Sequence, residues 1–292
     1  MLVVALLFAA VGVVAVNYRR QIVSRLTHWR GAPKHTADFE SGPPPVAHLA
    51  AVGDVGDSGG RLDALGACMA DIGAKQPYDA LVLLGDNAYP AGDPTKIEQT
   101  VFRPFGAVLE QGTELLAVMG NHDIRKGNAD AQLRALHMEH RWWTRTFGKV
   151  LLVGLDSNDP DNAEQLAFLD ATLGASAAAW KIVALHHPPY SAGYQGSSHH
   201  VREVFGPVFE RHGVRLVLSG HDHDYQRSHD INGVTYIVSG AGARSRRTGT
   251  RSFTAEAFAW RHFLDIAAYD ERLVVQPVNA DAQVAEVVIL RN

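Results

Sequence analysis

The sequence contains a single cysteine, Cys68, so the chain cannot form an internal disulfide. This scarcity excludes a fold stabilised by several disulfides and fits a reducing compartment, although an exported protein without disulfides would have the same composition. The sequence also lacks a strong excess of charge of either sign, because its formal net charge is −4 over 292 residues. Such a balance gives no reason to expect a nucleic-acid partner.

Long apolar runs are equally rare, and the clearest is LVVALLFAAVGVVAV at residues 2–16. At about 1.5 Å per residue in a helix, this run would cover roughly 22 Å of a hydrocarbon core that is about 30 Å thick. No Lys or Arg precedes the run, so the basic region that begins a secretory signal is missing. We therefore predict that residues 1–30 form a membrane-anchoring or signal-like segment.

The charges around this segment also predict where the protein resides. Arginines follow the apolar run, and the positive-inside rule then leaves the main domain of a single-pass membrane protein in the cytoplasm. Export after cleavage of the segment is the alternative. Residues 31–45 (GAPKHTADFESGPPP) are typical of a Pro-rich linker, so the main domain is predicted to cover residues 46–292.

Short apolar runs alternate with helical patterns throughout this main domain. Long apolar strands separated by helices indicate a sheet covered on both faces, and the closing strands add an antiparallel portion. We predict one α/β domain, a mixed sandwich. The expected strands lie at 46–53, 79–85, 114–120, 149–156, 180–187, 214–220, 234–240, 262–268, 272–278 and 284–290. The expected helices lie at 61–73, with Asp57 or Ser58 as its cap, 162–174 and 200–212.

Polar clusters follow five of these strands, at the point where each strand ends. Functional residues in open α/β sheets gather outside the carboxyl ends of strands, and a glycine before the polar residue lets the backbone turn and approach a ligand. One such cluster would be an ordinary turn, but five of them, in a chain with 15 histidines, predict a metal site. The clusters are VGDVGDSG (52–59), LGDNAYP (84–90), MGNHD (119–123), LHHPPYS (185–191) and SGHDHDY (219–225).

The residue types in these clusters favour two metal ions. Carboxylates, imidazoles and an amide oxygen suit borderline-to-hard ions such as Zn, Mn or Fe, and an aspartate can bridge two ions. In His221-Asp222-His223 the two imidazoles are two residues apart. An extended backbone therefore places them on one side, where they can reach different ions.

Taken together, Asp54, GDN (85–87), GNHD (120–123), His186 and GHDH (220–223) resemble the calcineurin-like metallophosphoesterase superfamily. Most members carry Asp-x-His in the first motif, whereas this chain has Asp-Val-Gly there. Purple acid phosphatases also lack that histidine and have a tyrosine three residues after the bridging aspartate. Tyr89 occupies this place, so the closest resemblance is to the small, tartrate-resistant type of purple acid phosphatase.

This resemblance implies a four-layer αββα sandwich, in which two mixed β-sheets are flanked by helices, and a centre with two metal ions. One ion, Fe³⁺, would be bound by Asp54, Asp86, Tyr89 and His223. The second ion, Fe²⁺, Zn²⁺ or Mn²⁺, would be bound by Asp86, Asn121, His186 and His221, with Asp86 bridging.

The resemblance also implies hydrolysis of phosphate monoesters, in which a metal-bound hydroxide attacks phosphorus in line. His122 would stabilise the transition state or protonate the leaving oxygen. His200, or His199 beside it, would assist, since the family has a histidine in that stretch. Asn121, together with these histidines, would contact the substrate, which is a phosphorylated small molecule or a phosphoprotein.

Alternatives remain at several of these positions. Tyr89 could be a packed aromatic residue, His122 a partner of Asp123, and the pair 199–200 a solvated helix start. The loop GARSRRTGTR (242–251) is either a solvated basic segment or a rim, including Arg244, that attracts anionic substrates.

Two other functions compete with the monoesterase. The first is a phosphodiesterase on the same site, acting on cyclic nucleotides or phospholipid headgroups. The second is a non-catalytic, metal-stabilised binding domain, for which loss of a ligand would be expected. Asp222 and Tyr225 are expected to orient the ligands, and the sequence leaves the oligomeric state open.

Overall fold

The structure is a computed structural model that describes residues 35–36 and 44–292. The predicted anchor at residues 1–30 and most of the predicted linker lie outside the described residues. Among the helices of the described part, none has both the length and the apolar character that crossing a bilayer requires. Membrane association therefore stays a prediction.

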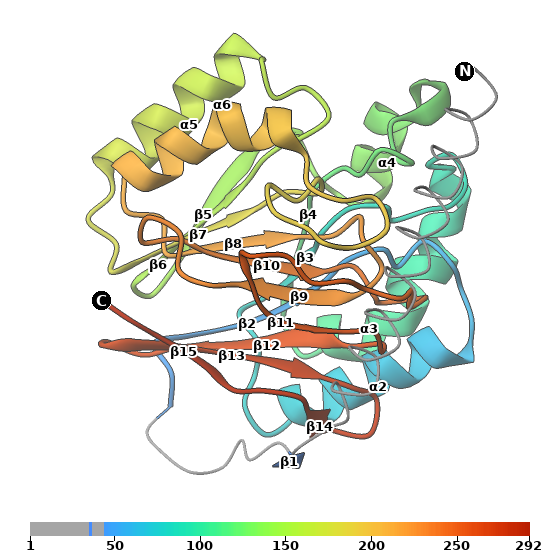
Figure 1. Cartoon of the computed structure of the whole chain (residues 1–292). Coiled ribbons are helices and arrows are strands. Elements are labelled where there is room, and N and C mark those ends of the chain that lie inside the picture. The colour runs from blue at the N-terminus through green and yellow to red at the C-terminus, as the bar shows by residue number, and fades with distance from the viewer. Residues whose placement is uncertain (1–34, 37–43) are drawn as a thin grey trace, which may run out of the picture.

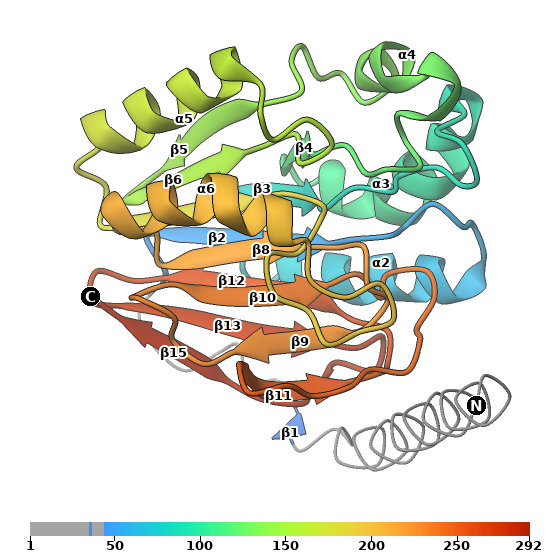
Figure 2. The ribbon, with the colours of Figure 1, turned by 45° about the horizontal axis from the view of Figure 1, so that its top comes forward.

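Two β-sheets stack face to face and form the centre of the fold (Figures 1 and 2). The eight-stranded sheet has the order β1-β14-β13-β12-β2-β3-β4, with β15 beside β13, and the seven-stranded sheet has the order β11-β9-β10-β8-β7-β6-β5. The first sheet consists of β1 (His35–Thr36), β2 (Ala47–Val52), β3 (Ala80–Leu83), β4 (Glu114–Ala117), β12 (Phe263–Ala268), β13 (Arg272–Val278), β14 (Gln283–Val284) and β15 (Val288–Arg291). The second consists of β5 (Trp143–Phe147), β6 (Val150–Gly154), β7 (Trp180–Ala184), β8 (Leu216–Ser219), β9 (Tyr225–Ser228), β10 (Thr235–Ser239) and β11 (Thr254–Phe258).

Both sheets are mixed, as predicted. In the first, β2, β3 and β4 are parallel, whereas β12 runs antiparallel to β2. In the second, β6, β7, β8 and β10 are parallel, and β5, β9 and β11 are antiparallel to their neighbours. Parallel strands need crossover segments between them, and these segments supply the helices.

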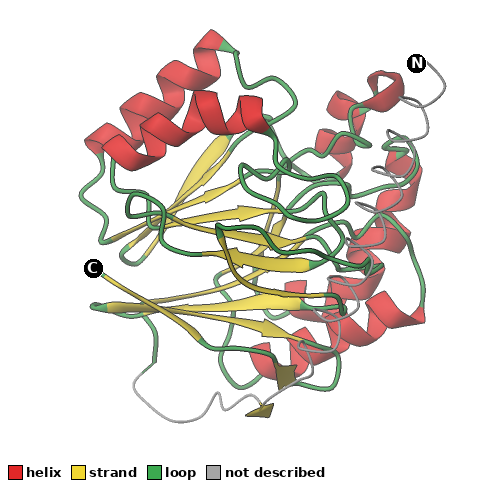
Figure 3. Ribbon diagram, viewed as in Figure 1, coloured by secondary structure: helices red, strands yellow, loops and turns green. Residues whose placement is uncertain are grey.

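The helices lie on the two outer sides of the paired sheets (Figure 3). Helices α5 (Ala163–Ala175) and α6 (His199–Arg211) cover the seven-stranded sheet, while α2 (Gly60–Gly73) and α3 (Arg103–Leu109) lie on the side of the other sheet (Figures 1 and 2). The helix α4 (Ala129–Ala135) lies in the crossover between the sheets. Short helical turns occupy Pro94–Lys96, Glu98–Phe102 and Arg125–Gly127. This arrangement confirms the predicted four-layer sandwich.

Apolar side chains fill the space under these helices and between the sheets. Leu169 of α5 and Phe205 of α6 are fully buried against Val183 and Val217 of the seven-stranded sheet. Leu83, Leu218 and residues of both sheets belong to a second, larger cluster. Burying one such side chain contributes about 1.5–3 kcal/mol, so this core holds the strand ends in place.

Helices α5 and α2 begin in different ways. In α5, the Asn162 side chain accepts a hydrogen bond from the Gln165 N–H, which satisfies one of the free donors of the first turn. Helix α2 begins after Gly59 and has no side-chain cap, so the prediction that Asp57 or Ser58 caps it is wrong. The Asp57 carboxylate instead forms an ion pair with Arg244.

Candidate metal centre

The predicted ligands follow the carboxyl ends of strands from both sheets. Because β2, β3 and β4 are parallel to one another and β7 is parallel to β8, their polar clusters meet at one edge of the sandwich. The residues that follow the first-sheet strands are Asp54, Asp86, Tyr89 and Asn121. Those that follow the second-sheet strands are His186, His221 and His223.

Three donor atoms form a first group. The Tyr89 hydroxyl lies 2.9 Å from Asp54 Oδ1 and 3.0 Å from His223 Nε2. The third pair, His223 Nε2 and Asp54 Oδ1, is 3.2 Å apart. Two hard oxygen donors and one imidazole nitrogen are therefore directed at a common point.

A second group is centred on His186 Nε2. Asn121 Oδ1 and His221 Nδ1 each lie 3.2 Å from this nitrogen, and Asp86 Oδ1 lies 3.5 Å from it. One ligand atom each of Asp54, Asp86 and His186 also lie within 4.8 Å of one another, so Asp86 stands between the two groups. The structure thus brings the predicted ligands together in two groups, and this donor set fits borderline-to-hard transition-metal ions.

Burial disfavours the negatively charged forms of the side chains in this cluster unless a bound cation stabilises them. Burial raises the pKa of the Asp54 carboxyl to about 6 and also raises the pKa of the Tyr89 hydroxyl. Burial lowers the pKa of His221 to about 2 and that of His186 well below its usual value, so both imidazoles are neutral, as metal ligands must be. Buried carboxylates beside neutral imidazoles are the arrangement that a bound cation stabilises.

The tautomer of His186 is fixed by the backbone. Its Nδ1 lies 2.8 Å from the Leu84 carbonyl oxygen, which can only accept, so the hydrogen resides on Nδ1. Nε2 therefore keeps its lone pair and faces the other donors of the second group. The backbone also orients Asp54. Its Oδ2 accepts a hydrogen bond from the backbone N–H of His221 at 2.8 Å, which leaves Oδ1 directed at the first group.

The backbone at three candidate ligands is strained. Asp54, Asp86 and His221 have φ angles of 58°, 54° and 72°, in the left-handed region that residues other than glycine seldom adopt. Such conformations persist where the surrounding structure enforces them, and they concentrate at functional sites. A Cβ atom at Gly120 would lie 2.2 Å from Asp86 Oδ1, so this position has to be glycine for the strands to bring their ligands together.

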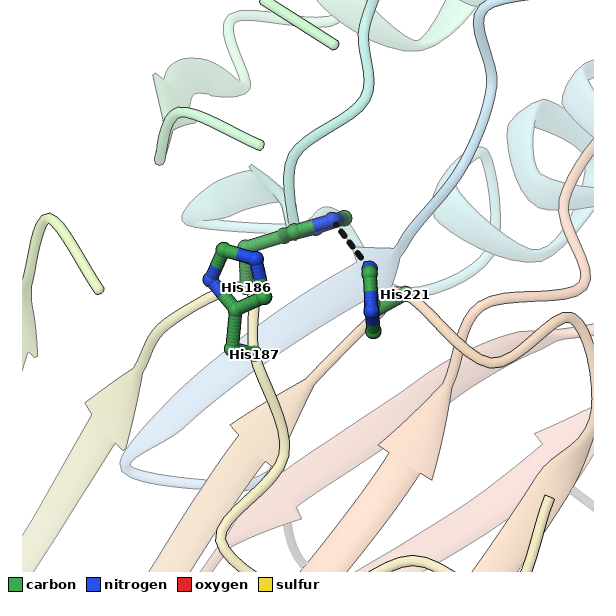
Figure 4. A group of neighbouring side chains, drawn as sticks. All are labelled: His186, His187 and His221. Carbon is green, nitrogen blue, oxygen red and sulfur yellow. Dashed lines mark hydrogen bonds between the residues drawn. The ribbon is translucent and has the colours of Figure 1, made fainter. Parts of the chain in front are cut away.

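A third imidazole, which the sequence did not single out, lies beside the second group (Figure 4). The ring of His187 is 4.7 Å from that of His221, and ligand atoms of both lie within 4.8 Å of one in His186. Ser157 Oγ accepts the N–H groups of His186 and His187 at 3.2 and 2.9 Å and lies 3.0 Å from His187 Nδ1. Ser157 thus fixes the turn that carries His186.

A pocket of about 340 Å³ opens over both groups. The predicted substrate contacts Asn121, His122 and Arg244 line it, as does Arg246 of the predicted basic rim, and so do two residues that the sequence did not single out: Lys96 and Gln195. The remaining lining residues are Asp57, Asp86, Tyr89, Pro90, His221 and His223. The positions of Lys96 and Gln195 depend on the paths of the loops, for which the sequence gives no signal.

His200 is not brought to the pocket. It lies exposed in the first turn of α6, and its Nε2 is 2.7 Å from Asp161 Oδ2. His199 is likewise directed away, toward Arg202. In this chain the stretch before α6 supplies Gln195, which lines the pocket in place of a histidine.

Two supporting predictions have different outcomes. Asp222, buried between the two histidines of its motif, accepts hydrogen bonds from the loop 191–197 and so orients a wall of the pocket. Tyr225 does not orient the ligands, because its hydroxyl donates to Glu286 at 2.6 Å and its ring stacks on Phe258.

The His122 side chain contacts the Pro90 carbonyl at 2.8 Å. This contact replaces the alternative partner Asp123, whose oxygens accept from the Gly120 and Asn87 N–H groups.

Comparisons with known proteins agree with this geometry. The family model for calcineurin-like phosphoesterases matches residues 47–225. Purple acid phosphatase 17 of Arabidopsis thaliana is 31% identical over 233 aligned positions, and the match covers 67% of this chain and 68% of that protein. Tartrate-resistant acid phosphatase type 5 of Oryctolagus cuniculus is 30% identical over 197 aligned positions, and the match covers 56% of this chain and 60% of that protein.

Solved structures share the fold. The purple acid phosphatase PPD1 from seeds of yellow lupin (Lupinus luteus) superposes with a TM-score of 0.72 at 17% identity, over 85% of this chain and 55% of that one. GAP50 of Plasmodium superposes with a TM-score of 0.74 at 20% identity, over 84% and 88% of the two chains. The acid phosphatase relatives imply a dinuclear metal centre, for which the two groups of donor atoms are the candidate. The family model for calcineurin-like phosphoesterases matches more than half of the chain, residues 47–225. The protein therefore belongs to the calcineurin-like phosphoesterase family and is a metallophosphoesterase, an enzyme that hydrolyses phosphoric esters.

Proposed function

We propose that this metallophosphoesterase is a phosphate monoesterase of the purple acid phosphatase type, with Fe³⁺ in the first group of donors and Fe²⁺, Zn²⁺ or Mn²⁺ in the second. The observation that carries the proposal is the position of the Tyr89 hydroxyl, 2.9 Å from Asp54 Oδ1 and 3.0 Å from His223 Nε2. A phenolate is a hard oxygen donor that suits ferric iron. The names of the acid phosphatase relatives support the same activity.

The ions would supply charge neutralisation at the phosphate oxygens and activation of water. The chain would supply the proton and the orientation. His122 Nδ1 faces the Pro90 carbonyl oxygen at 2.8 Å and therefore carries a hydrogen, which leaves Nε2 as the nitrogen available to the substrate. This nitrogen lies 3.9 Å from Asp86 Oδ2, beside the candidate centre, where a protonated imidazole can deliver a proton to the leaving oxygen.

Contacts to the rest of the phosphate would come from the pocket wall. Asn121 can donate from its amide nitrogen while its Oδ1 faces the second group. Arg244 lies at the rim, where its ion pair with Asp57 holds the guanidinium in place. Membrane attachment through residues 1–30 belongs to the same proposal and is supported only by the apolar run at residues 2–16.

The experiment that tests this function uses the purified chain loaded with iron together with zinc or manganese. Hydrolysis of p-nitrophenyl phosphate is compared with that of bis(p-nitrophenyl) phosphate across pH, with Asp86→Asn as the control. We expect fast turnover of the monoester that the control lacks. A preference for the diester would make the protein a phosphodiesterase, and bound metal without turnover of either ester would make it a binding domain.

A further inference from the structure

Positive charge is concentrated in one exposed region beside the candidate metal centre. Residues 244–247 (RSRR) are all exposed. The backbone on either side of Arg244 is bonded to the segments that carry the ligands. The Ala243 N–H donates to the Asp54 carbonyl at 3.2 Å, and the Arg246 N–H donates to the His223 carbonyl at 2.6 Å. The arginines therefore lie at the edge of the sandwich where the ligands meet.

Two further arginines reach this region from other elements. Arg61 is exposed in the first turn of α2, and Arg261 donates to the Ala243 carbonyl at 2.8 Å. Burial and the neighbouring charge of Arg61 lower the pKa of Arg261, so the two guanidinium groups repel each other. Arg61 is also unfavourably placed in its helix, because the amino end of a helix carries a partial positive charge. An anionic partner would relieve both effects.

Acidic side chains do not balance these charges. Asp57 forms an ion pair with Arg244. The guanidinium groups of this region that form no ion pair with any described residue are those of Arg61, Arg246, Arg247 and Arg261. The formal net charge of the whole chain is −4, so this region differs in sign from the molecule as a whole. Its field therefore attracts an anionic partner.

An exposed aromatic side chain accompanies the arginines. Tyr194 has 79% of its surface accessible, the largest fraction among the exposed large apolar side chains of the described residues. The Arg246 guanidinium carbon lies 5.8 Å from the centre of its ring, within the range of a cation–π contact. The loops that carry the two residues touch, since a Cβ atom on Gly249 would come within 2.8 Å of the Ala192 carbonyl oxygen. Exposed tyrosine among basic residues is typical of surfaces at the level of lipid headgroups.

The directions of the strands place β1 at the same end of the sandwich. Strand β13 is parallel to β2, because both run antiparallel to β12. Strand β14 follows the carboxyl end of β13, and β1 pairs with β14 (Figure 1). Strand β1 therefore lies at the end that carries the metal centre. An anchor formed by the apolar run at residues 2–16 would tether the domain by this end.

We propose that Tyr194, Arg61, Arg246, Arg247 and Arg261, which we call the docking face, bind the anionic headgroups of a phospholipid bilayer, so that the pocket opens toward the membrane. This inference goes beyond the proposed function, because it concerns a partner surface and needs no turnover. Each arginine close to an anionic bilayer strengthens binding about fivefold, and salt weakens the attraction.

The test uses the metal-loaded full chain with an environment-sensitive nitrobenzoxadiazole dye on Ser245→Cys or on Glu271→Cys. Both positions are exposed, but Glu271 follows the carboxyl end of β12 and so lies at the opposite end of the sandwich. Cys68 is buried, and the unsubstituted chain measures any labelling of it. We expect vesicles that contain phosphatidylglycerol to shift the emission at position 245 to shorter wavelength. Vesicles of phosphatidylcholine alone should not, and the dye at position 271 should respond to neither.

Charge variants show whether the docking face itself makes the contact. Arg61→Gln combined with Arg247→Gln should lower the ratio of docked to free domains about thirtyfold, as measured by the dye at a fixed lipid concentration. Replacing the same two arginines by lysine should preserve docking. Lys149→Gln combined with Arg272→Gln is the matched control, because it removes the same charge from exposed positions at the opposite end. This control should leave the ratio unchanged.

Three outcomes would overturn the proposal: a shift at position 271 in place of 245, an equal shift with neutral vesicles, or an equal loss in the control variant. A shift with soluble polyglutamate but none with anionic vesicles would also overturn it and would indicate an acidic protein partner. Flotation with neutral vesicles reports insertion of residues 1–30 separately. None of these measurements depends on hydrolysis, so the docking face is tested independently of the phosphatase.

Discussion

Strand β2 has a buried cluster of one aspartate, one histidine and one tyrosine at each end. At its amino end, Asp265 Oδ2 lies 2.9 Å from His48 Nε2 and accepts the Tyr78 hydroxyl at 2.7 Å. We call these three residues the closed triad. At the carboxyl end, Asp54, Tyr89 and His223 form the first group of donors, at similar distances.

The surroundings differ although the residue types are the same. In the closed triad, His48 Nδ1 is bonded to the Gln76 carbonyl at 3.0 Å, so both ring nitrogens have partners within the protein. All three members of this triad are at most 2% exposed. In the first group of donors, Tyr89 and His223 line a pocket, and the backbone at Asp54 is strained.

Residue types alone therefore do not distinguish a metal site from a buried hydrogen-bond network. A network satisfies its own donors and acceptors, whereas a metal site directs lone pairs at one accessible point. Four sets of measurements can test whether the two clusters differ in this way.

The largest effect is expected from the carboxylate of the first group. Asp54→Asn removes a charged ligand, so metal affinity should fall at least about a hundredfold and turnover should fall with it. The metal-free protein should become more stable, because a buried carboxylate is lost. Metal content after dialysis, turnover and thermal unfolding without metal measure the three effects. Undiminished metal content would exclude Asp54 as a ligand.

The matching change in the closed triad is Asp265→Asn. It leaves His48 without its carboxylate, and breaking a buried ion pair costs about 3–5 kcal/mol of unfolding free energy. Urea denaturation checks this cost. Turnover per folded, metal-loaded molecule should stay unchanged, since the triad lies at the far end of β2. If turnover fell as steeply as in Asp54→Asn, the two clusters would not be independent.

A third contrast concerns pH. Burial raises the pKa of Asp54 from 3.8 to about 6 in the metal-free fold, so the folded state holds this proton more tightly than the unfolded chain. The resulting stabilisation is complete below about pH 4 and is lost as the pH rises through 6, a change of about 3 kcal/mol. The difference in unfolding free energy between wild type and Asp54→Asn measures it.

Metal loading should abolish this pH dependence, because a cation favours the charged carboxylate. The closed triad provides the control. Burial is the largest single influence on the pKa of His48 and lowers it, but the hydrogen bond to Asp265, the charge of that carboxylate and hydrogen bonds to the backbone together outweigh burial, so the pKa is raised on balance. Its contribution is therefore present below pH 6.5 and lost as the pH rises through the folded value, with or without metal. A metal-dependent change in this second contribution would contradict the assignment.

The smallest effects on stability are expected from the two tyrosines. Tyr89→Phe should abolish the visible charge-transfer band of the iron-loaded protein, because a phenolate ligand is lost. Tyr78→Phe removes only the hydrogen bond to Asp265, so the colour should persist and stability should fall by about 1 kcal/mol. Absorption spectra and urea denaturation of the two variants settle the comparison. A band that survives Tyr89→Phe would exclude Tyr89 as the iron ligand.

Most of the sandwich was predictable because its central strands are continuous apolar runs. The strands at 79–85 and 234–240 correspond to β3 and β10, and the run at 284–290 corresponds to two short strands, β14 and β15. The sequence did not predict β5, β9 or β11. Of these, β5 and β11 lie at the edges of their sheet, and β5 carries exposed polar residues, so an apolar pattern is absent.

The candidate site was most predictable where a ligand directly follows a strand. The sheet itself brings such residues together, as it does for Asp86 and His186. Some residues placed by loops were missed or misplaced, because a loop path depends on contacts distant in sequence. Gln195 reaches the pocket through Asp222, and His200 is held outside it by Asp161. The bond between His48 and Asp265, 217 residues apart, has no local signal at all.

The origin of the ligands has a mechanical consequence. Asp54, Asp86 and Asn121 extend from one sheet, and His186, His221 and His223 from the other. Two bound ions would therefore act as a removable cross-link between the layers of the sandwich. Separating the sheets would require releasing the ions, so the rate of unfolding would be governed by metal dissociation. A chelator would therefore make the folded enzyme less resistant to unfolding before it changed the fold itself.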